Sequence, residues 1–421
     1  MSQSLFHSRP MRIAVIGAGP AGFYTAEELL RGPVEARVDL FDRLFAPYGL
    51  VRYGVAPDHP KTKLVTSRFD RVAADERVRF LGGIEIGPDI RVEQLRTAYD
   101  AIVVTTGAET SRMLNIPGEE LPHCHHAIDF VAWYNGHPEY TDRRFDLSGD
   151  TAVIIGNGNV AIDLARILAK PTDTLAPTDI ARHALDALGK SQVQNIIVLG
   201  RRGPAQSSFT RAELKELQDL AWIDPAELDL NEASRVELDK DTQGQKIFTL
   251  FEGFPSIPPQ GRNITFRWLR SPVEIVENGV RVALNTLQGD AGDQKALRTE
   301  QREEIPCGLV LKSIGYFGQA LPGLPFDEDL GIIPNQEGRV EGHPGVYVSG
   351  WIKRGPSGLI GHNKRCAADT VAAIWKDLED LVPAETTKQR PLDLSTAISW
   401  ADWQGIAARE AAQGFKVTRY P

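Results

Sequence analysis

Two short glycine-rich segments are the part of this chain whose residue types and spacing most clearly indicate chemistry. The first segment reads GAGPAG and contains Gly17, Gly19, Pro20, Ala21 and Gly22. The second reads GNGNVA and contains Gly156, Asn157, Gly158, Asn159 and Val160. Glycine at such positions allows a tight turn and a close approach of the backbone to a pyrophosphate, which rests on the N-terminus of the following helix. Two such segments predict two bound dinucleotides, and therefore hydride transfer between a flavin and a nicotinamide.

The residues around the first segment support this interpretation. Residues 12–16 form a predicted apolar strand, and residues 23–30 have helical spacing. A second predicted strand, residues 36–41, is followed by Asp42 at close to the ~20-residue spacing expected of an acid that hydrogen-bonds a ribose hydroxyl pair. The first site therefore suits an unphosphorylated adenosine ribose, as in FAD or NAD.

The second segment is followed by residues of the opposite charge. Residues 152–155 and 162–169 are the predicted strand and helix, and the next strand, residues 195–199, leads to Arg201 and Arg202. Arginine donates to phosphate in a bidentate manner and stays charged, so this pair indicates a 2′-phosphate and hence NADP. FAD is left for the first site. The alternative, a solvated arginine pair and an acid that merely ends a strand, would have to hold at both sites at once.

The order of these segments predicts an α/β fold with two Rossmann-like dinucleotide-binding domains. We expect a discontinuous FAD-binding domain of residues 1–108 and 326–421, with an NADP-binding domain of residues 109–325 inserted in it. Residues 170–191 form a polar stretch that we expect to extend the helical region of the second domain. Residues 255–300, with alternating strands at 263–268 and 279–285, predict a small antiparallel unit.

The chain then returns to the first domain. Residues 345–350 form a predicted strand, and a glycine-rich turn at 351–361 leads to a predicted helix at 363–378. A helix N-terminus aimed at the flavin pyrimidine would stabilise negative charge on the reduced ring. The alternative is an ordinary surface turn.

Composition excludes several other functional classes. The 421 residues carry a net charge of −9, which gives no general support for nucleic-acid binding. Residues 1–11 lack an apolar signal core, and no run approaches the ~18 apolar residues of a membrane span, so we expect a cytoplasmic protein. Cys124, Cys307 and Cys366 form no CxxC pair and no iron–sulfur ligand cluster, and we predict no metal site. Electrons must then pass from the flavin directly to an acceptor outside the chain.

Five motifs occur in the order typical of one family. They are residues 16–24 (IGAGPAGFY), 48–60 (YGLVRYGVAPDHP), 156–161 (GNGNVA), 200–204 (GRRGP) and 351–356 (WIKRGP). Together they resemble ferredoxin–NADP reductases of the adrenodoxin-reductase type, over residues 11 to about 380. The long second motif is the most specific of the five. The tail, residues 383–421, lies outside this resemblance and receives no function from it.

The resemblance implies roles for individual residues. FAD is expected on the first turn and on Ala21, Asp42, Leu50, Ile86, Trp351, Gly358, Leu359 and Ile360. NADP is expected on Asn157, Gly158, Asn159, Val160, Arg201 and Arg202, with Glu213 nearby and Gly358 near the nicotinamide. His59 and Glu216 are expected to face one another near the nicotinamide entry, where they either relay a proton or close the domain interface. Asp42 departs from the longer Glu that is more usual in this family.

The resemblance also implies a one-electron iron–sulfur partner. Ferredoxins are usually acidic, so we expect a local basic surface despite the overall negative charge. The candidates are Arg211, Lys215, Arg262, Arg267, Arg270, Lys353 and Arg354. Two alternatives stay open: an NADPH-dependent flavoprotein that reduces quinones or other small acceptors, and a flavin-binding subunit of a larger electron-transfer complex.

Overall fold

The structure is a computed structural model, and it describes residues 9–379 and 392–413. Contacts between Cα atoms divide the chain into two compact units. Unit 1 comprises residues up to 55, residues 59–110 and those from 315 onward, and unit 2 comprises residues 56–58 and 111–314. Unit 2 is therefore inserted in the sequence of unit 1, and each unit is described by itself below.

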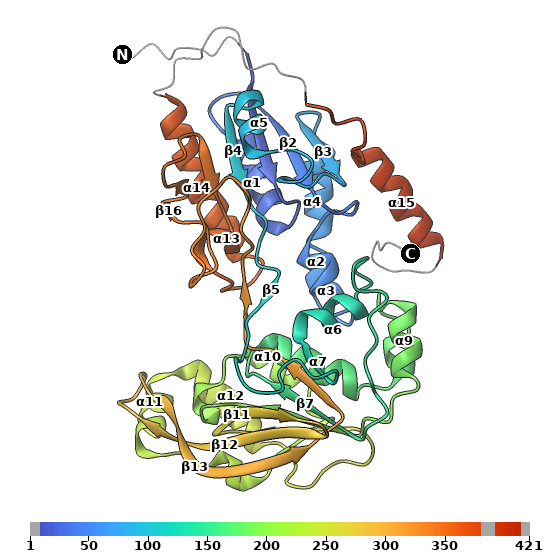
Figure 1. Cartoon of the computed structure of the whole chain (residues 1–421), viewed down its shortest axis with the longest axis vertical. Helices are drawn as coiled ribbons and strands as arrows, with labels where there is room; N and C mark the ends of the chain where they lie inside the picture. Colours follow the sequence, from blue (N-terminus) through green and yellow to red (C-terminus); the bar gives the residue numbers. More distant parts are fainter. Residues whose placement is uncertain (1–8, 380–391, 414–421) are drawn as a thin grey trace. The chain divides into compact units, whose positions relative to one another are not determined.

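Unit 1 is built on a mainly parallel sheet with the strand order β16-β17-β18-β4-β1-β2-β3 (Figure 1). The parallel strands are β1 (Met11–Ile16), β2 (Ala36–Asp42), β3 (Val78–Gly82), β4 (Ala101–Val104) and β18 (Val346–Val348). Two short strands, β16 (Asn335–Gln336) and β17 (Arg339–Val340), add antiparallel pairs at one edge. Because β1 lies between β2 and β4, the strand order reverses beside it, and this is where α/β sheets bind ligands.

Helices cover both faces of this sheet. The helices of unit 1 are α1 (Pro20–Leu30), α2 (Leu50–Tyr53), α3 (Pro60–Lys63), α4 (Thr66–Ala73), α5 (Val92–Ala98), α13 (Trp351–Arg354), α14 (His362–Glu379) and α15 (Trp400–Ala412). Alternate residues of β1 enter different cores: Ile13 and Val15 pack with α1, α4, α14 and α15, whereas Ala14 and Ile16 pack with α5 and α13. A sheet buried on both faces explains why β1 is apolar throughout.

Unit 2 contains a six-stranded parallel sheet with the order β6-β14-β7-β8-β10-β9. Its strands are β6 (Cys124–His126), β7 (Thr151–Ile155), β8 (Asn195–Leu199), β9 (Ala221–Trp222), β10 (Asn263–Arg267) and β14 (Leu309–Lys312). Its helices are α6 (Ala127–Tyr134), α7 (Asn159–Ala169), α8 (Thr172–Leu175), α9 (Arg182–Leu188), α10 (Arg211–Lys215), α11 (Glu232–Lys240) and α12 (Thr242–Glu252), with 3-10 turns at Pro204–Gln206 and Pro225–Leu228. Strand β7 again lies where the order reverses, so both units are Rossmann-like and the predicted fold class is confirmed.

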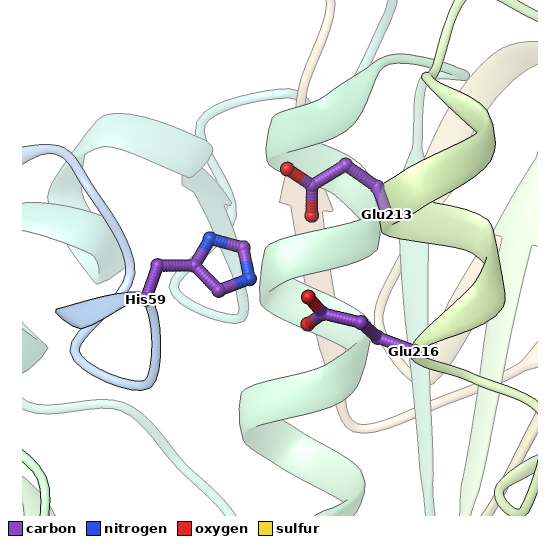
Figure 2. Close-up of side chains that lie close together, drawn as sticks. All are labelled: His59, Glu213 and Glu216. Carbon is purple, nitrogen blue, oxygen red and sulfur yellow. The ribbon is translucent and has the colours of Figure 1, made fainter. Parts of the chain in front are cut away.

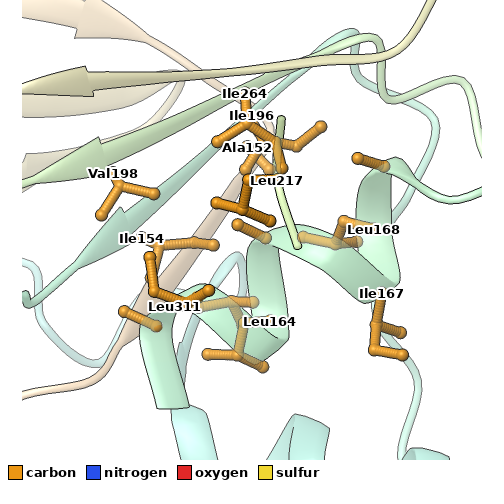
Figure 3. Packing of buried hydrophobic residues seen from close by; sticks show 14 of the residues in the cluster. Ala152, Ile154, Leu164, Ile167, Leu168, Ile196, Val198, Leu217, Ile264 and Leu311 are labelled. Carbon is orange, nitrogen blue, oxygen red and sulfur yellow. The ribbon is translucent and has the colours of Figure 1, made fainter. Parts of the chain in front are cut away.

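The core of unit 2 lies between this sheet and α7. Figure 3 shows Ile154, Ile196 and other strand side chains facing Leu164 and Leu168 of the helix. All four of these side chains are fully buried. The packing fixes the start of α7, and with it the second glycine-rich turn, at the carboxyl end of β7.

An antiparallel sheet of three long strands completes unit 2. It consists of β11 (Arg270–Val276), β12 (Gly279–Gln288) and β13 (Lys295–Pro306). A separate two-stranded sheet pairs β5 (Thr110–Ser111) with β15 (Tyr316–Phe317).

One local prediction was wrong and a second was confirmed. The strand predicted at 263–268 is β10, which pairs in parallel with β8 and β9 instead of joining the antiparallel unit. The alternation of apolar and polar residues in this segment predicts a strand but does not identify the strand's partner. The antiparallel sheet begins only after Leu269, which has a φ of +56° and turns the chain into β11. Residues 170–191 extend the helical region as expected, in the form of two separate helices, α8 and α9, because Pro171 follows the end of α7.

Candidate functional site

The first glycine-rich turn joins β1 to α1. Gly17 has a φ of +107°, and a Cβ atom placed there would lie 2.8 Å from the carbonyl oxygen of Thr105, so only glycine fits. Helix α1 has Gly19 as its N-cap and Pro20 in its first turn. Neither residue brings a polar side chain that could cap the helix, so the backbone N–H groups at this end of α1 are left to a ligand or to water. Nearby, the buried hydroxyl of Thr106 has no hydrogen-bond partner in the described part of the chain.

Residues 48–53 pack directly on this turn. The Tyr48 N–H donates to the carbonyl of Ala18 at 2.8 Å, and a Cβ atom at Gly49 would lie 3.0 Å from the Cα of Gly19. Tyr48 has a φ of +83°, which is rare for a residue with a side chain. Leu50 begins α2 immediately afterwards, so the second sequence motif supplies one wall of the first turn.

Asp42 lies at the carboxyl end of β2 and is tied to the same turn. Its Oδ2 accepts a hydrogen bond from the Ala18 N–H at 2.8 Å, and its Oδ1 accepts one from the Leu44 N–H at 2.9 Å. Burial raises the pKa of Asp42 to about 6, although both backbone hydrogen bonds act in the opposite direction. Each carboxylate oxygen keeps a second lone pair, so the side chain can still accept from a ribose hydroxyl.

The other residues expected at FAD belong to three segments of unit 1. Ile86 is buried, and its segment is joined to the end of β2 because the Ile84 N–H donates to the Asp42 carbonyl at 3.0 Å. Trp351 begins α13 next to Gly350, where a Cβ atom would lie 2.5 Å from the Cβ of Ala21. Gly358, Leu359 and Ile360 lie between α13 and α14, and the Leu359 side chain is 59% exposed.

The second turn repeats the geometry of the first. Gly156 has a φ of +140°, and a Cβ atom there would lie 2.0 Å from the Ser313 carbonyl oxygen. Helix α7 starts at Asn159 with Gly158 as its N-cap, and a Cβ atom at Gly158 would meet no atom within 4 Å. The Asn157 Oδ1 is buried without a hydrogen-bond partner in the part of the chain described. The open turn leaves room for a ligand phosphate at the start of α7. The unsatisfied Oδ1 is an acceptor and suits a donor group of a ligand, such as a hydroxyl.

The loop that carries Arg201 and Arg202 is fastened to this turn. The Thr210 N–H donates to Asn159 Oδ1 at 2.8 Å, and the Ser208 N–H donates to the Asn157 carbonyl at 3.0 Å. The Arg201 side chain is exposed and Arg202 is half-buried. Within residues 9–379 and 392–413, neither guanidinium has a hydrogen bond or an ion pair, so both remain available to a ligand phosphate.

Thr210 also sets the position of two acidic residues. Its side chain caps α10 by accepting from the Glu213 N–H, and Figure 2 shows the carboxylates of Glu213 and Glu216 extending in the same direction from this segment. Both are 3.4 Å from nitrogens of Arg166, an arginine of α7 whose side chain is fully buried. The capped helix therefore presents two carboxylates to a single cation.

Arg166 is the centre of a charge network that the sequence analysis missed. Its guanidinium also contacts Asp58 and Asp163 at 2.7 Å, and Lys170 contacts Asp58 at 2.7 Å. Burial works against the charge of Arg166, but hydrogen bonds to these carboxylates outweigh it and raise the pKa of Arg166. Burial likewise opposes ionisation of Asp58, yet Arg166 and Lys170 hold the pKa of Asp58 well below its usual range. Asp58 and Arg166 are therefore both ionised at neutral pH.

The second motif is divided between the units at this point. Residues 56–58 belong to unit 2, where Asp58 bonds Arg166, and residues up to 55 belong to unit 1. His59 is the next residue in the sequence; it occupies the N-cap position of the four-residue helix α3 of unit 1 and is half-buried.

Several expected docking residues are already engaged. Arg267 contacts Glu303 at 2.6 Å, and Arg270 contacts Glu227 at 2.9 Å. Arg262 donates to the carbonyls of Leu168, Leu188 and Ser191, Lys353 donates to Thr370, and Arg354 donates to Asn363. Arg211 and Lys215, on α10, have exposed side chains.

The cysteines contribute no redox pair. Cys124, Cys307 and Cys366 are all buried and free. Burial raises the pKa of Cys124 to about 11 and that of Cys307 to about 12, so neither thiol ionises at neutral pH. Among the residues described, no helix has the length and apolar character needed to cross a membrane.

Comparisons with known proteins agree with this geometry. The family model described as pyridine nucleotide-disulphide oxidoreductase matches residues 11–192. The NADPH-ferredoxin reductase FprA of Mycobacterium tuberculosis is 44% identical, over 96% of this chain and 91% of its own length. The mitochondrial NADPH:adrenodoxin oxidoreductase of Bos taurus is 40% identical, over 96% of this chain and 88% of its own. The solved structure of Mycobacterium tuberculosis FprA in complex with NADPH has a TM-score of 0.91 at 42% identity, covering 96% of this chain and 95% of that chain.

Proposed function

Because this chain belongs to the family of NADPH-ferredoxin and NADPH:adrenodoxin reductases, we propose that it is an FAD-dependent ferredoxin–NADP(+) reductase, EC 1.18.1.2. The observation that carries the proposal is the pair of Rossmann-like turns with different residues beside them. Asp42 lies beside the first turn, and Arg201 and Arg202 follow the second. The two turns thus suit two different dinucleotides.

The residues of unit 1 fit FAD. The α1 N-terminus and Gly19 would hold the pyrophosphate, and Asp42 would accept hydrogen bonds from the adenosine ribose. Leu50, Ile86, Trp351 and residues 358–360 complete the proposed site. FAD, when bound, accepts a hydride from NADPH and passes the electrons on one at a time. We therefore assign the FAD-binding domain to residues 1–108 and 326–421.

The residues of unit 2, within 109–325, fit NADP. The α7 N-terminus and residues 157–160 would hold the pyrophosphate, while Arg201 and Arg202 donate to the 2′-phosphate. The hydrogen bonds from Ser208 and Thr210 to the turn keep the arginine-bearing loop in place. Glu213 is assigned to the NADP site, and Gly358 to the nicotinamide.

We assign His59 and Glu216 to the entry of the nicotinamide. His59 directly follows Asp58, whose carboxylate is fixed by Arg166, and Arg166 also contacts Glu216. Because hydride transfer itself needs no side-chain acid, the role that we assign to His59 and Glu216 is an auxiliary one. They hold or move a proton beside the reacting rings, and they close the site to water. A His59→Gln variant with an unchanged rate and pH profile of flavin reduction by NADPH would contradict this role.

The proposed partner is an acidic ferredoxin in the cytoplasm. Arg211 and Lys215 are the two candidates on α10 whose side chains are exposed, whereas Arg267 and Arg270 are neutralised by glutamates. Association between opposite exposed charges is screened over about 10 Å at 0.1 M salt, so ferredoxin reduction should slow steeply with added salt.

The test follows the electrons from NADPH to the acceptor. NADPH should bleach the bound flavin, and cytochrome c reduction should start only when ferredoxin is added. Charge reversal at Arg211 and Lys215 should raise the KM for ferredoxin, while the matched reversal at Lys190, an exposed lysine of the same unit, should not. Faster turnover of an uncharged quinone than of any ferredoxin, with no salt dependence, would favour the quinone reductase alternative. Flavin reduction without turnover of any free acceptor would favour a subunit of a larger complex.

A further inference from the structure

The tail of the chain contains a helix with a buried carboxylate on its apolar face. Ser399 and Asp402 form a capping box that starts α15. Trp403, Ile406, Ala407 and Glu410 follow the i, i+3, i+4, i+7 spacing of one helix face. Trp403 packs in the core of unit 1, and Glu410 is fully buried. A carboxylate at the last position of an apolar stripe needs a specific partner.

That partner is Arg52, in the second sequence motif. The Arg52 guanidinium donates to both carboxylate oxygens of Glu410, at 2.6 and 3.3 Å. The side chains of Arg52 and Glu410 are 1% and 0% exposed. The same guanidinium lies 5.0 Å from the ring centroid of Trp403 and 5.2 Å from that of Tyr53. Two aromatic rings and a bidentate carboxylate therefore fix the direction of this arginine.

A second contact leads from α15 to the strained residue of the motif. The Trp403 indole N–H donates to the Tyr48 hydroxyl at 3.3 Å, and that hydroxyl donates to Asp70 at 2.6 Å. Tyr48 is the residue with a φ of +83°, and its N–H bonds the Ala18 carbonyl of the glycine-rich turn. Such a conformation persists only where surrounding contacts hold it.

We propose that α15 is a positioning element for FAD. Glu410 and Trp403 hold Arg52 and Tyr48, so that the backbone of residues 48–50 lies against the first turn with its strained geometry already formed. Neither α15 residue is assigned a contact with the flavin; both are positioning residues. The inference rests on the proposed function, because that function places FAD at the first turn.

The experiment compares two substitutions on the same helix. Glu410→Gln keeps the size of the side chain but removes its charge, and Arg409→Gln changes an exposed neighbour that faces away from the core. Release of FAD is followed by the rise of flavin fluorescence after dilution. We expect release from Glu410→Gln to be about ten-fold faster, the equivalent of one hydrogen bond, and release from Arg409→Gln to match the wild type.

A second measurement separates positioning from general instability. Adenosine 2′,5′-bisphosphate requires only unit 2, so its affinity should stay within about two-fold in Glu410→Gln. The double variant Arg52→Leu/Glu410→Leu replaces the buried ion pair by apolar side chains, which can restore stability. If this double variant has the Tm of the wild type but releases FAD faster, the positioning role of α15 is supported. If it has the Tm of the wild type and releases FAD at the wild-type rate, the positioning role is overturned. If Glu410→Gln does not fold, Trp403→Phe, which keeps a ring but removes the N–H, is measured in the same way.

The outcomes also distinguish the inference from the proposed function. A wild-type chain that binds no FAD would overturn the proposed function. A wild-type chain that binds FAD, with folded variants of Glu410 and Trp403 that release it no faster, would overturn only the role of α15.

Discussion

The buried acid at the first turn leads to a prediction about pH. Burial raises the pKa of Asp42 from 3.8 to about 6 in the chain without flavin. At 1.36 kcal/mol for each pKa unit, the ionised carboxylate costs about 3 kcal/mol relative to an exposed one. Because the pKa is raised, the protonated form stabilises the fold: this contribution is complete below pH 3.8 and is lost as the pH rises through about 6.

Bound FAD should reverse this preference. A ribose hydroxyl that donates to the Asp42 carboxylate stabilises its ionised form and lowers its pKa in the complex. Binding then releases a proton below pH 6, so the Kd for FAD should be flat from pH 7 to 8. It should rise about ten-fold for each pH unit below 6, until the pKa of the complex is reached. The side chain in the Asp42→Asn variant cannot ionise, so the Kd of this variant for FAD should be higher than that of the wild type at pH 8 and should not change with pH.

The assay is quenching of flavin fluorescence as FAD is titrated into the flavin-free protein between pH 5 and 8. Thermal unfolding of the same samples defines the range in which the fold is intact. The reasoning is refuted if the wild-type Kd does not change between pH 5 and 7. It is also refuted if Asp42→Asn shows the same pH dependence, since another group would then be titrating.

Three further predictions concern unit 2 and the two turns. Replacing Arg201 and Arg202 by Ala should remove two charge-assisted hydrogen bonds of roughly 1.5 kcal/mol or more each, so that kcat/KM falls at least about one hundred-fold for NADPH but little for NADH; equal losses in stopped-flow flavin reduction would contradict the assignment. Gly17→Val should give protein without flavin, whereas Gly156→Val should stay yellow and fail to react with NADPH; selective loss of FAD from the second variant would show that the two sites are reversed. Arg166→Met should remove the bidentate partner of the buried Asp58, which would keep only its contact with Lys170, and lower the free energy of unfolding by about 3 kcal/mol at pH 7. That loss should shrink as the pH falls below 4, because a carboxylate with a lowered pKa stabilises the fold only where it is ionised; a loss that does not vary with pH would argue against the ion pair.

The sequence predicted the parts of the two sites that depend on local pattern. The strand–turn–helix around Gly17, the acid at the end of β2 and the loop after β8 each lie within one βαβ segment, where apolar periodicity and glycine spacing carry the information. The structure places Asp42 against the first turn, and it fastens the loop that carries Arg201 and Arg202 to the second turn through Thr210. The ligands assigned to these residues stay predictions.

Contacts between distant segments could not be predicted in this way. The hydrogen bond from Tyr48 to Ala18 and the pairing of β10 with β8 join segments whose own patterns do not identify a partner. Buried charges did leave a signal that was missed. Arg166 lies one turn from both Asp163 and Lys170 on an otherwise largely buried helix, and Glu410 follows Ile406 by four residues on the apolar face of α15. A charge at such a position predicts a buried partner, although it does not say which one.

Both of these signals lead to the same motif, residues 48–60. Arg52 pairs with Glu410 of α15, and Asp58 pairs with Arg166 of α7. Each pair joins an arginine and a carboxylate that are far apart in the sequence, and each has almost no exposed surface. Removing one partner of a buried ion pair is strongly destabilising, although Lys170 would still contact Asp58 if Arg166 were lost. Residues up to 55 belong to the unit with the first turn, and residues 56–58 to the unit with the second. Residues 48–60 therefore contribute one buried ion pair to each unit. If α15 positions FAD as proposed, loss of the Arg52 pair should speed the release of FAD. Loss of the Asp58 pair should instead change the surroundings of Glu213 and Glu216, which contact the same Arg166.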